Sequence, residues 1–320
     1  MTADTILYLS GDDVAAALEH VDAIAAVAAA FEAHGRGETI LPPEAYLGWE
    51  RDGETLRSLS MPACLDSTPG VKVINGNPAN PGRGLSRASG LTLLFDPATA
   101  VPVCVMEGAR ISCVRTAAVS AIAAELLAAH PVERLALLGA GALARCHLRV
   151  LPARLPELRE IRAYDVEPAR ARTLEADVPV LVCDSAEQAI RGAGLVVTVT
   201  TTTTGYIRHS WLDPGALLVN VSLDDPLPEV LLRADKLFVD DWSLVAADEH
   251  RLLGRMIREG TIRAVDGELG ELLVGSRPGR THPDEIVVVN PFGLAIEDLA
   301  IAREVYRHAS ASGLGTSLLR

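Results

Sequence analysis

The segment Leu135–Ala144 constrains the fold of this chain more than any other part of it. It reads LALLGAGALA: four apolar residues, then glycines and an alanine at the spacing G-x-G-x-x-A, then a helix-forming run. Gly139 allows a tight turn after a strand, Gly141 lets the backbone approach a phosphate closely, and Ala144 lets a helix pack against the strand. Because the positive end of that helix faces the loop, the segment predicts a Rossmann-type site for the pyrophosphate of a dinucleotide.

The residues that follow match this interpretation. A strand is expected at 161–164, and it ends at Asp165, which lies 26 residues after Gly139. An acid at this position accepts hydrogen bonds from the adenosine ribose and repels the extra phosphate of NADP, so we expect NAD as the cofactor. Arg170 lies nearby and could soften this preference, and a glycine turn with an incidental acid is the plain alternative.

The threonine-rich run 198–204 comes at the end of the expected fourth strand of this region, at the edge of the sheet where ligands bind. Its hydroxyls either face the cofactor or reflect only the β-propensity of threonine followed by a polar loop. We expect the cofactor-binding residues to be Gly139, Ala140, Gly141, Ala142, Leu143, Asp165, Thr200, Thr201 and Ser222.

Strands and helices alternate after Thr116, which predicts a parallel sheet covered by helices on both faces. The expected strands are 135–138, 161–164, 178–182, 195–200, 217–222, 236–239 and 285–289, and the expected helices are 117–129, one from Ala142, 185–190, 244–259 and a last one at 295–309. Residues 1–115 mix types, with a helix over 12–34 and strands at 56–61, 71–75, 91–95 and 101–106. The segment Asp96–Thr99 predicts a hairpin turn between the last two strands.

Composition excludes several classes of function. The net charge of −13 disfavours nucleic-acid and membrane-surface binding. The longest apolar run, 23–31, is about half of what is needed to span a bilayer. Five scattered cysteines without a C-x-x-C pair, and no histidine at ligand spacing, indicate a reducing, cytoplasmic compartment and no metal site.

Five segments together resemble the ornithine cyclodeaminase/mu-crystallin family over essentially the whole chain. They are KVINGNPAN at 72–80, RTAAVS at 115–120, the Gly139 loop, NVSLD at 220–224 and NPFGLAIED at 290–298. The resemblance implies an α/β fold in which a Rossmann NAD-binding domain (116–295) is inserted into an α/β domain (1–115 plus 296–320) that binds the substrate and forms a homodimer. It also implies hydride transfer at the C–N bond beside an amino-acid carboxylate.

Within the family, the chain is most similar to the branch that makes 2,3-diaminopropionate for siderophores and peptide antibiotics. The segments that carry this similarity include RASG at 87–90, DDWS at 240–243 and ELGELLVG at 268–275. The branch is implied to oxidise N-(2-amino-2-carboxyethyl)-L-glutamate with NAD, yielding 2-oxoglutarate and 2,3-diaminopropionate. Leu59 stands where the ornithine cyclodeaminases carry a glutamate, which argues against ornithine cyclisation.

A small anionic amino-acid substrate needs cations at its carboxylates. Arg115 and Lys72 match carboxylate-binding positions of the family, and Arg57 and Arg87 could serve the second and third carboxylates. Lys72 lies between Val71 and Val73, so by alternation it points inward unless it is a solvated charge. Asp224 is expected to be the base that deprotonates the amine or the attacking water.

Each of these residues also has a structural interpretation. Arg115 could be a surface residue near a helix start, and Asp224 or Asp225 could cap a helix before Pro226. Glu297 and Asp298 are expected to be structural acids in the first turn of the last helix. Two other functions stay open at this point: another enzyme of the family (ornithine cyclodeaminase, ketimine reductase or alanine-type dehydrogenase), and a non-catalytic protein that binds NAD.

Overall fold

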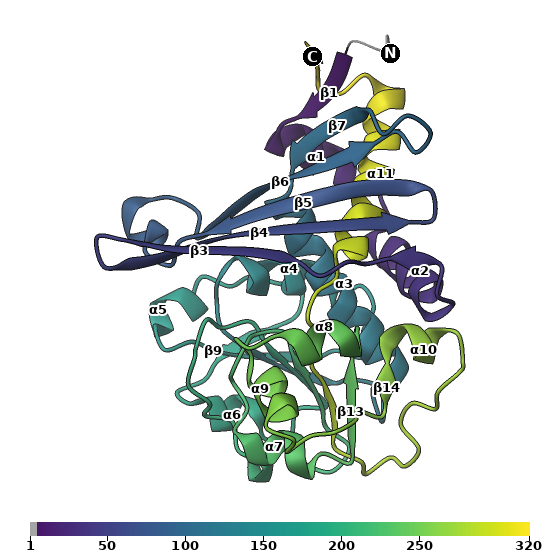
Figure 1. Cartoon of the computed structure of the whole chain (residues 1–320). Helices are drawn as coiled ribbons and strands as arrows, with labels where there is room; N and C mark the ends of the chain where they lie inside the picture. The colour runs from purple at the N-terminus through teal and green to yellow at the C-terminus, as the bar shows by residue number, and fades with distance from the viewer. Residues whose placement is uncertain (1–4) are drawn as a thin grey trace. The chain divides into compact units, whose positions relative to one another are not determined.

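The structure, a computed structural model, describes residues 5–320, so the first four residues of the expected N-terminal domain lie outside it. The chain divides into two compact units (Figure 1). The first comprises the described residues up to Arg115 together with Leu294–Arg320, and the second is Thr116–Gly293. The division at Thr116 falls inside helix α3 (Ala109–Leu127). Each unit has its own eight-stranded sheet.

The sheet of the first unit is mostly antiparallel. Its order is β16-β1-β7-β6-β5-β4-β2, and β3 also pairs with β4. Only the β1–β7 pair among these described strands is parallel. The strands are β1 (Thr5–Leu9), β2 (Thr39–Ile40), β3 (Ala45–Arg51), β4 (Glu54–Leu65), β5 (Thr68–Gly76), β6 (Ala88–Phe95), β7 (Pro102–Glu107) and β16 (Thr316–Leu319).

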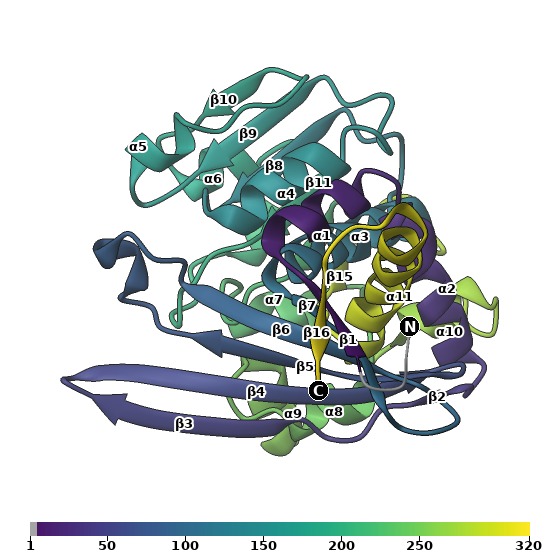
Figure 2. The ribbon, with the colours of Figure 1, turned by 90° about the horizontal axis from the view of Figure 1, so that it is seen from above.

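Helix α11 (Ala295–Ser312) packs on one face of this sheet, against β4, β5 and β6 (Figure 2). A methyl group on Gly70 of β5 would lie 2.6 Å from Cδ2 of Leu299, so glycine allows this close approach. Helix α2 (Ala23–Gly35) lies beside α11 and buries Phe31. The chain thus returns from its last strand of the second unit to complete the core of the first.

The N-terminal helix expected over 12–34 is two helices, so that prediction was wrong. Helix α1 (Gly11–Leu18) begins after Ser10, whose hydroxyl accepts a hydrogen bond from the N–H of Asp13. Helix α2 begins after Asp22, whose carboxylate accepts from the N–H of Ala25. Because Asp22 is a good helix start, it ends the run that alanine propensity alone would continue.

The sheet of the second unit is parallel in every pair between its described strands, in the order β10-β9-β8-β11-β12-β15-β13-β14. The strands are β8 (Arg134–Leu138), β9 (Glu160–Tyr164), β10 (Val180–Val182), β11 (Leu195–Thr198), β12 (Leu217–Asn220), β13 (Lys236–Val239), β14 (Gly267–Glu268) and β15 (Val287–Val289). The chain reverses direction across the sheet at β8 and β11, and ligands of such sheets bind at this switch point.

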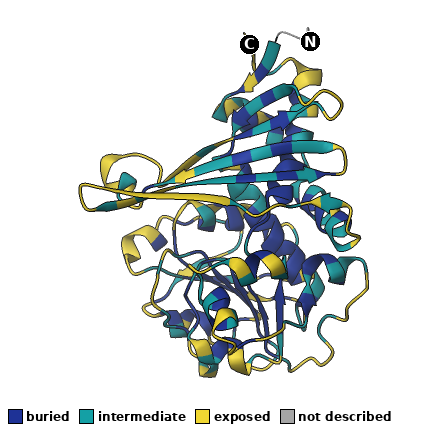
Figure 3. Cartoon of the chain, viewed as in Figure 1, coloured by how far each residue is buried: buried dark blue, intermediate teal, exposed yellow. Residues whose placement is uncertain are grey.

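The helices of the second unit are α4 (Ala142–Val150), α5 (Pro168–Ala171), α6 (Ala186–Ile190), α7 (Pro228–Arg233), α8 (Trp242–Ala247), α9 (Leu252–Arg258) and α10 (Leu269–Leu273), and α3 continues into it. Two short 3-10 turns, η1 (Asn80–Arg83) in the first unit and η2 (His209–Trp211) in this one, complete the elements. The central strands β8, β11, β12 and β15 are almost wholly buried (Figure 3).

Two helix predictions in this region were wrong. The expected helix at 244–259 is α8 and α9, because the chain folds back: a methyl group on Gly254 would lie 1.9 Å from the carbonyl oxygen of Asp248. The helix expected to begin at Ala117 begins at Ala109, where the carboxylate of Glu107 accepts from the N–H groups of Ala109 and Arg110. The α/β fold class with a Rossmann-type parallel sheet is confirmed. No single helix among residues 5–320 is long and apolar enough to cross a membrane, although the bent pair α1 and α2 passes by length and composition.

Candidate functional site

The loop between β8 and α4 has the geometry that a dinucleotide pyrophosphate requires. Gly139 has φ +99°, and a methyl group there would lie 2.8 Å from the carbonyl oxygen of Val199, so only glycine fits. A methyl group on Gly141 would meet no heavy atom within 4 Å, which shows open space above the loop. Gly141 is also the N-cap of α4 and has no side-chain cap, so the positive end of the helix opens toward this space.

The other predicted residues of this loop take different places. Ala142 is exposed and Leu143 is half-buried in the first turn of α4, beside the open space. Ala140 is buried, and its N–H donates to Oδ2 of Asp165 at 2.8 Å. The N–H of Ala140 therefore positions Asp165 and is not free to donate to another group.

Asp165 follows β9 and is fixed by the backbone. Its Oδ2 accepts from Ala140, and its Oδ1 accepts from the N–H of Glu167 at 2.8 Å. A carboxylate has about four acceptor positions, so two remain for hydroxyl donors. Arg170, the cation that could have softened the NAD preference, pairs with Glu167 at 2.8 Å.

The threonine-rich segment after β11 is hydrogen-bonded to the residues that follow β12. The N–H of Thr200 donates to Oγ of Ser222 at 2.8 Å, and its hydroxyl donates to Oδ1 of Asp225 at 2.8 Å. Tyr206 donates to the same oxygen at 2.9 Å. Burial raises the pKa of Asp225, and the hydrogen bonds from Thr200 and Tyr206 oppose this. Thr200 and Ser222 therefore hold the loop, whereas Thr201 is exposed beyond it.

Asp224 is buried and held from both sides of its carboxylate. Its Oδ1 accepts from the N–H of Leu252 at 2.7 Å, and its Oδ2 accepts from Nη2 of Arg255 at 3.0 Å. Neither Asp224 nor Asp225 caps the following helix, because the N-cap of α7 is Leu227. The structural alternative for Asp224 as a helix cap is therefore wrong, and its orientation is set by α9.

Lys72 lies on β5 and points into the first unit, as its alternation with two valines predicted. It is 1% exposed. Its Nζ donates to Oγ of Ser112 at 2.9 Å and to Oδ2 of Asp298 at 3.0 Å, and it lies 2.9 Å from the other oxygen of Asp298. Burial lowers the pKa of Lys72, while the charge of Asp298 raises it. A buried ammonium that is held in this way presents a fixed positive charge.

Arg115 belongs to the same cluster. Its Nη1 donates to Oε2 of Glu297 at 2.7 Å, and its Nε lies 3.4 Å from Oδ2 of Asp298. The side chain is 11% exposed, so part of it reaches the surface of the first unit. We call Lys72, Arg115, Glu297 and Asp298 the buried ion cluster.

The interpretation of Glu297 and Asp298 as structural acids was incomplete. Glu297 does accept from the N–H of Leu294 at the start of α11, as a first-turn acid does. Both side chains are nevertheless 0% exposed and supply the counter-charges of the two cations. The signal that points to this is an adjacent acid pair inside an otherwise apolar run, LAIEDLAIA.

Arg57 and Arg87, the two further predicted substrate-binding residues, lie on β4 and just before β6. Both are exposed. Partial burial of its guanidinium lowers the pKa of Arg87, and the positive charge of Arg57 lowers it further. The first sheet places Arg57 directly opposite Gly76 on β5, and Arg87 just before Ala88, the residue of β6 that is opposite Gly76.

Comparison with known proteins decides the family. The model of the ornithine cyclodeaminase/mu-crystallin family matches residues 6–313. The chain belongs to this family. The resemblance found in the sequence is therefore confirmed, including its similarity to the 2,3-diaminopropionate branch.

Three relatives of this family member are similar over nearly the whole chain. The N-((2S)-2-amino-2-carboxyethyl)-L-glutamate dehydrogenase of Staphylococcus aureus is 33% identical, with 98% of each chain covered. The crystal structure of CmnK is 39% identical with a TM-score of 0.95, again with 98% of each chain covered. An archaeal alanine dehydrogenase, solved as a dimer with bound NAD, is 28% identical with a TM-score of 0.89, covering 98% of this chain and 99% of that one.

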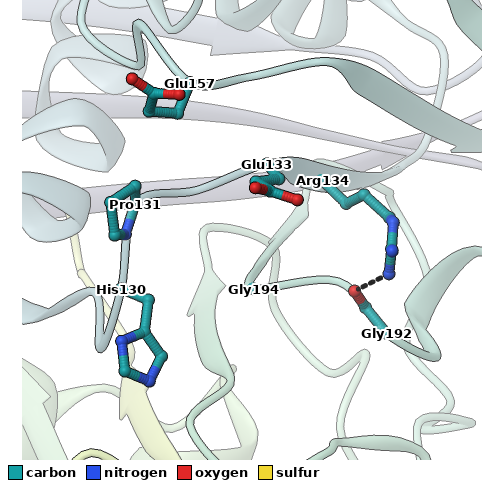
Figure 4. Close-up of a pocket in the computed structure, with 7 residues that line it drawn as sticks. All are labelled: His130, Pro131, Glu133, Arg134, Glu157, Gly192 and Gly194. Atoms are coloured by element: carbon teal, nitrogen blue, oxygen red, sulfur yellow. Dashed lines mark hydrogen bonds between the residues drawn. The ribbon is translucent and has the colours of Figure 1, made fainter.

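One surface hollow of the second unit is not part of this site. It measures about 360 Å³ and is lined by His130, Pro131, Glu133, Arg134, Glu157, Gly192 and Gly194 (Figure 4). Nη1 of Arg134 donates to the carbonyl of Gly192 across it at 2.8 Å. These residues lie before or at the starts of β8, β9 and β11, whereas the Gly139 loop follows β8. The hollow is therefore at the amino edge of the sheet, opposite the edge where ligands of such folds bind.

Proposed function

We propose that this chain is an NAD-dependent dehydrogenase that cleaves N-(2-amino-2-carboxyethyl)-L-glutamate to 2,3-diaminopropionate and 2-oxoglutarate. The observation that carries the proposal is the buried ion cluster, whose two fixed cations suit an amino-acid carboxylate. The 33% identity to a dehydrogenase of this substrate, over 98% of both chains, supports the specific substrate. A homodimer and a cytoplasmic location, both expected from the sequence, remain parts of this proposal.

The residues of the second unit fit NAD. Gly139, Gly141 and the first turn of α4, with Ala142 and Leu143, would hold the pyrophosphate, and Asp165 would accept from the ribose hydroxyls with its two remaining acceptor positions. Thr201 is exposed beside this loop, while Thr200 and Ser222 keep the ends of β11 and β12 in place. When bound, NAD supplies the acceptor for the hydride that leaves the carbon next to the amine.

Lys72 and Arg115 bind the substrate carboxylate in this proposal. An ammonium has three donors, and hydrogen bonds to Ser112 and Asp298 use two of those of Lys72. Arg115 is held by Glu297 and is partly exposed. Asp298 and Glu297 fix both cations before the substrate arrives, so no reorganisation is needed at that moment.

Asp224 is the proposed base. A hydride leaves only from a neutral amine, so a proton must first move from the substrate ammonium to a carboxylate oxygen. The Leu252 N–H and Arg255 fix the plane of the Asp224 carboxylate, and each oxygen keeps a free acceptor position. After oxidation, the C=N bond adds water, and its collapse gives the ketone of 2-oxoglutarate and the free amine of 2,3-diaminopropionate.

The alternatives differ in what they require of these residues. Alanine dehydrogenase activity is the second candidate, because the archaeal enzyme of that name is similar over the whole chain. Ornithine cyclodeaminase activity is disfavoured by Leu59. This residue pairs directly with Ile74 and shares the sheet face of Lys72, so no acid is available at this position to hold a second amino group of the substrate. A non-catalytic binding protein would have no reason to keep Lys72 and Arg115 ionised at high cost.

The test follows NADH absorbance in the direction of synthesis. Purified protein is mixed with NADH, 2-oxoglutarate and 2,3-diaminopropionate, with controls that lack either partner. We expect NADH loss that needs both, and a new compound with the mass of the coupled amino acid. NADH loss with pyruvate and ammonia alone would instead assign an alanine dehydrogenase. If no pair consumes NADH while NAD still binds, the enzyme proposal is wrong.

A further inference from the structure

One row of residues across the first sheet is buried along its whole length, and its two central members are polar. The row consists of Met61 on β4, Lys72 on β5, Thr92 on β6 and Met106 on β7. Each of these residues is at most 4% exposed. Directly opposite residues point to the same face of a sheet, so the Thr92 side chain lies beside that of Lys72 on the face that α11 covers (Figure 2).

The hydroxyl of Thr92 differs from the other polar groups near it. Thr92 is 0% exposed, yet among residues 5–320 its Oγ1 has no hydrogen-bond partner. A buried hydroxyl without a partner lowers the stability of a folded chain, and valine would fill nearly the same space without that cost. The neighbouring Nζ of Lys72, in contrast, is bound by Asp298 and Ser112. The Thr92 hydroxyl is therefore able to pair with a group from outside the chain.

Gly108 leaves space beside this hydroxyl. A methyl group on Gly108 would lie only 3.1 Å from Oγ1 of Thr92, so a larger residue would crowd the hydroxyl. Gly108 immediately precedes α3, and its carbonyl accepts from the N–H of Ser112 one turn later at 2.9 Å. Ser112 in turn contacts Lys72, and Arg115 follows on the same helix. The hydroxyl therefore lies at the start of the helix that contributes Arg115 to the buried ion cluster.

The groups around the hydroxyl suit an anion. The carboxylates of Asp298 and Glu297 already face the two cations of the cluster. The ammonium of Lys72 has three donors, of which its two hydrogen bonds leave one. This N–H and the Thr92 O–H are both donors, and a carboxylate accepts from several donors at once.

We propose that the Thr92 hydroxyl donates a hydrogen bond to the substrate carboxylate that Lys72 binds, and that Thr92 is a further substrate-binding residue. The inference rests on the proposed function and deepens it, because it concerns the carboxylate beside the reacting carbon. That carboxylate is common to 2-oxoglutarate, pyruvate and the coupled amino acid. Thr92 therefore contributes affinity for 2-oxo acids as a class and does not select among them.

Titration calorimetry tests this contact without turnover. The protein is saturated with NADH in the absence of any amine, and 2-oxoglutarate is titrated into it. Thr92→Val should bind 2-oxoglutarate about 10- to 100-fold more weakly than the wild type, because it loses a hydrogen bond to a charged acceptor. Thr92→Ser keeps the hydroxyl, so its affinity should stay within about three-fold of the wild type.

Thermal unfolding without the 2-oxo acid should show an effect of the opposite sign. Thr92→Val removes an unpaired buried hydroxyl, so its Tm should rise by about 1–3 °C. Thr198→Val is the matched comparison, because Thr198 is also 0% exposed but its hydroxyl donates to Oδ1 of Asn220 at 2.7 Å. Its Tm should fall by about 2–4 °C, since the Asn220 oxygen loses its donor. A variant that is more stable and yet binds more weakly has lost a ligand contact and not its fold.

Thr99→Val is the control for binding. Thr99 lies in an exposed turn of the first unit, where its hydroxyl donates to Oδ1 of Asp96 at 2.7 Å. Its affinity for 2-oxoglutarate should stay within about two-fold of the wild type.

Equal affinity of the wild type and Thr92→Val would overturn the contact. If the Tm of Thr92→Val also falls, a buried water already pairs with the hydroxyl. Failure of the proposed function is a separate result: the wild type then consumes no NADH with 2-oxoglutarate and 2,3-diaminopropionate. In that case the same titration with pyruvate still tests Thr92, and a wild type that binds neither acid shows that the contact is wrong.

Discussion

Lys72 on β5 and Arg57 on β4 point to one face of the first sheet, but their positive charges lie in opposite environments. At one end Lys72 is 1% exposed and is matched by the buried Asp298, with Arg115 and Glu297 as a second pair. At the other end Arg57 is exposed, as is Arg87 just before β6, and neither has a counter-charge among residues 5–320. A buried charge costs several kcal/mol and survives only when it is matched inside the protein. An exposed charge stays hydrated and costs little folding free energy, so it can remain unpaired until a ligand binds.

Removing one charge of the buried pair Lys72–Asp298 should have the largest effect on stability. Asp298→Asn leaves Lys72 buried without its main counter-charge and beside the repelling charge of Arg115. We expect the free energy of unfolding to fall by about 3–5 kcal/mol, measured by urea denaturation at pH 7.

Asp12→Asn is the control for this variant. The Asp12 side chain is 99% exposed and pairs with Arg110 at 3.4 Å, so its loss should change stability by less than about 0.5 kcal/mol. If Asp298→Asn is equally mild, the cluster does not contain a buried ion pair, and the contrast between the two ends is lost.

The second unit offers a buried titratable side chain, His147, for the same comparison. His147 on α4 is 0% exposed, with its ring nitrogens 2.8 Å from the carbonyl of Leu143 and 2.9 Å from the hydroxyl of Ser120. Burial lowers the pKa of His147 to about 4. Between about pH 6.5 and 4 the unfolded chain takes up a proton that the folded chain refuses, so stability present above this range is lost as the pH falls.

We expect this histidine to contribute about 3 kcal/mol to the loss of stability from pH 7 to pH 4. Urea denaturation at several pH values measures the loss, and His147→Asn, which does not titrate, should lack that part of the slope. His282→Asn, at an exposed histidine, is the control and should leave the slope unchanged. Identical slopes for the wild type and His147→Asn would contradict the assignment.

Removing both charges of the buried pair separates stability from function. The double variant Lys72→Met with Asp298→Leu deletes one positive and one negative charge and leaves Arg115 paired with Glu297. Its stability should lie within about 1–2 kcal/mol of the wild type, because apolar residues of similar volume replace a desolvated pair at little cost. NADH consumption should nevertheless fall at least about 100-fold if Lys72 binds substrate. Retained activity would remove Lys72 from the proposed site.

Local patterns predicted the second unit well. The four apolar residues before Gly139 and the glycine spacing after them are typical of a strand, a tight turn and a helix, so β8 and α4 follow from short-range sequence. The predicted helix boundaries were wrong where a tertiary contact decides them. The break between α8 and α9 depends on Gly254 packing against the Asp248 carbonyl, which no propensity encodes.

The candidate site was predicted one residue at a time, without its connections. The inward direction of Lys72 followed from alternation, whereas its partner Asp298 is 226 residues away in sequence. No local rule pairs residues at that distance. Strands β1 and β16 were missed for a related reason, because they pair with each other from the two ends of the described chain. Strand β3 was missed because all of its residues are exposed, so it lacks an alternation of buried and exposed side chains.

The smallest expected effect is also the one that tests the exposed end most directly. The double variant Arg57→Gln with Arg87→Gln should change the free energy of unfolding by less than about 0.5 kcal/mol, because neither arginine has a side-chain partner within residues 5–320. Removal of two repelling charges could even raise stability slightly, and adding glutarate should stabilise the wild type but not the variant. Differential scanning fluorimetry with and without glutarate measures both. A destabilised variant would show that these arginines already serve the fold, and the distinction between a charge matched inside the protein and one kept for a ligand would no longer describe this sheet face.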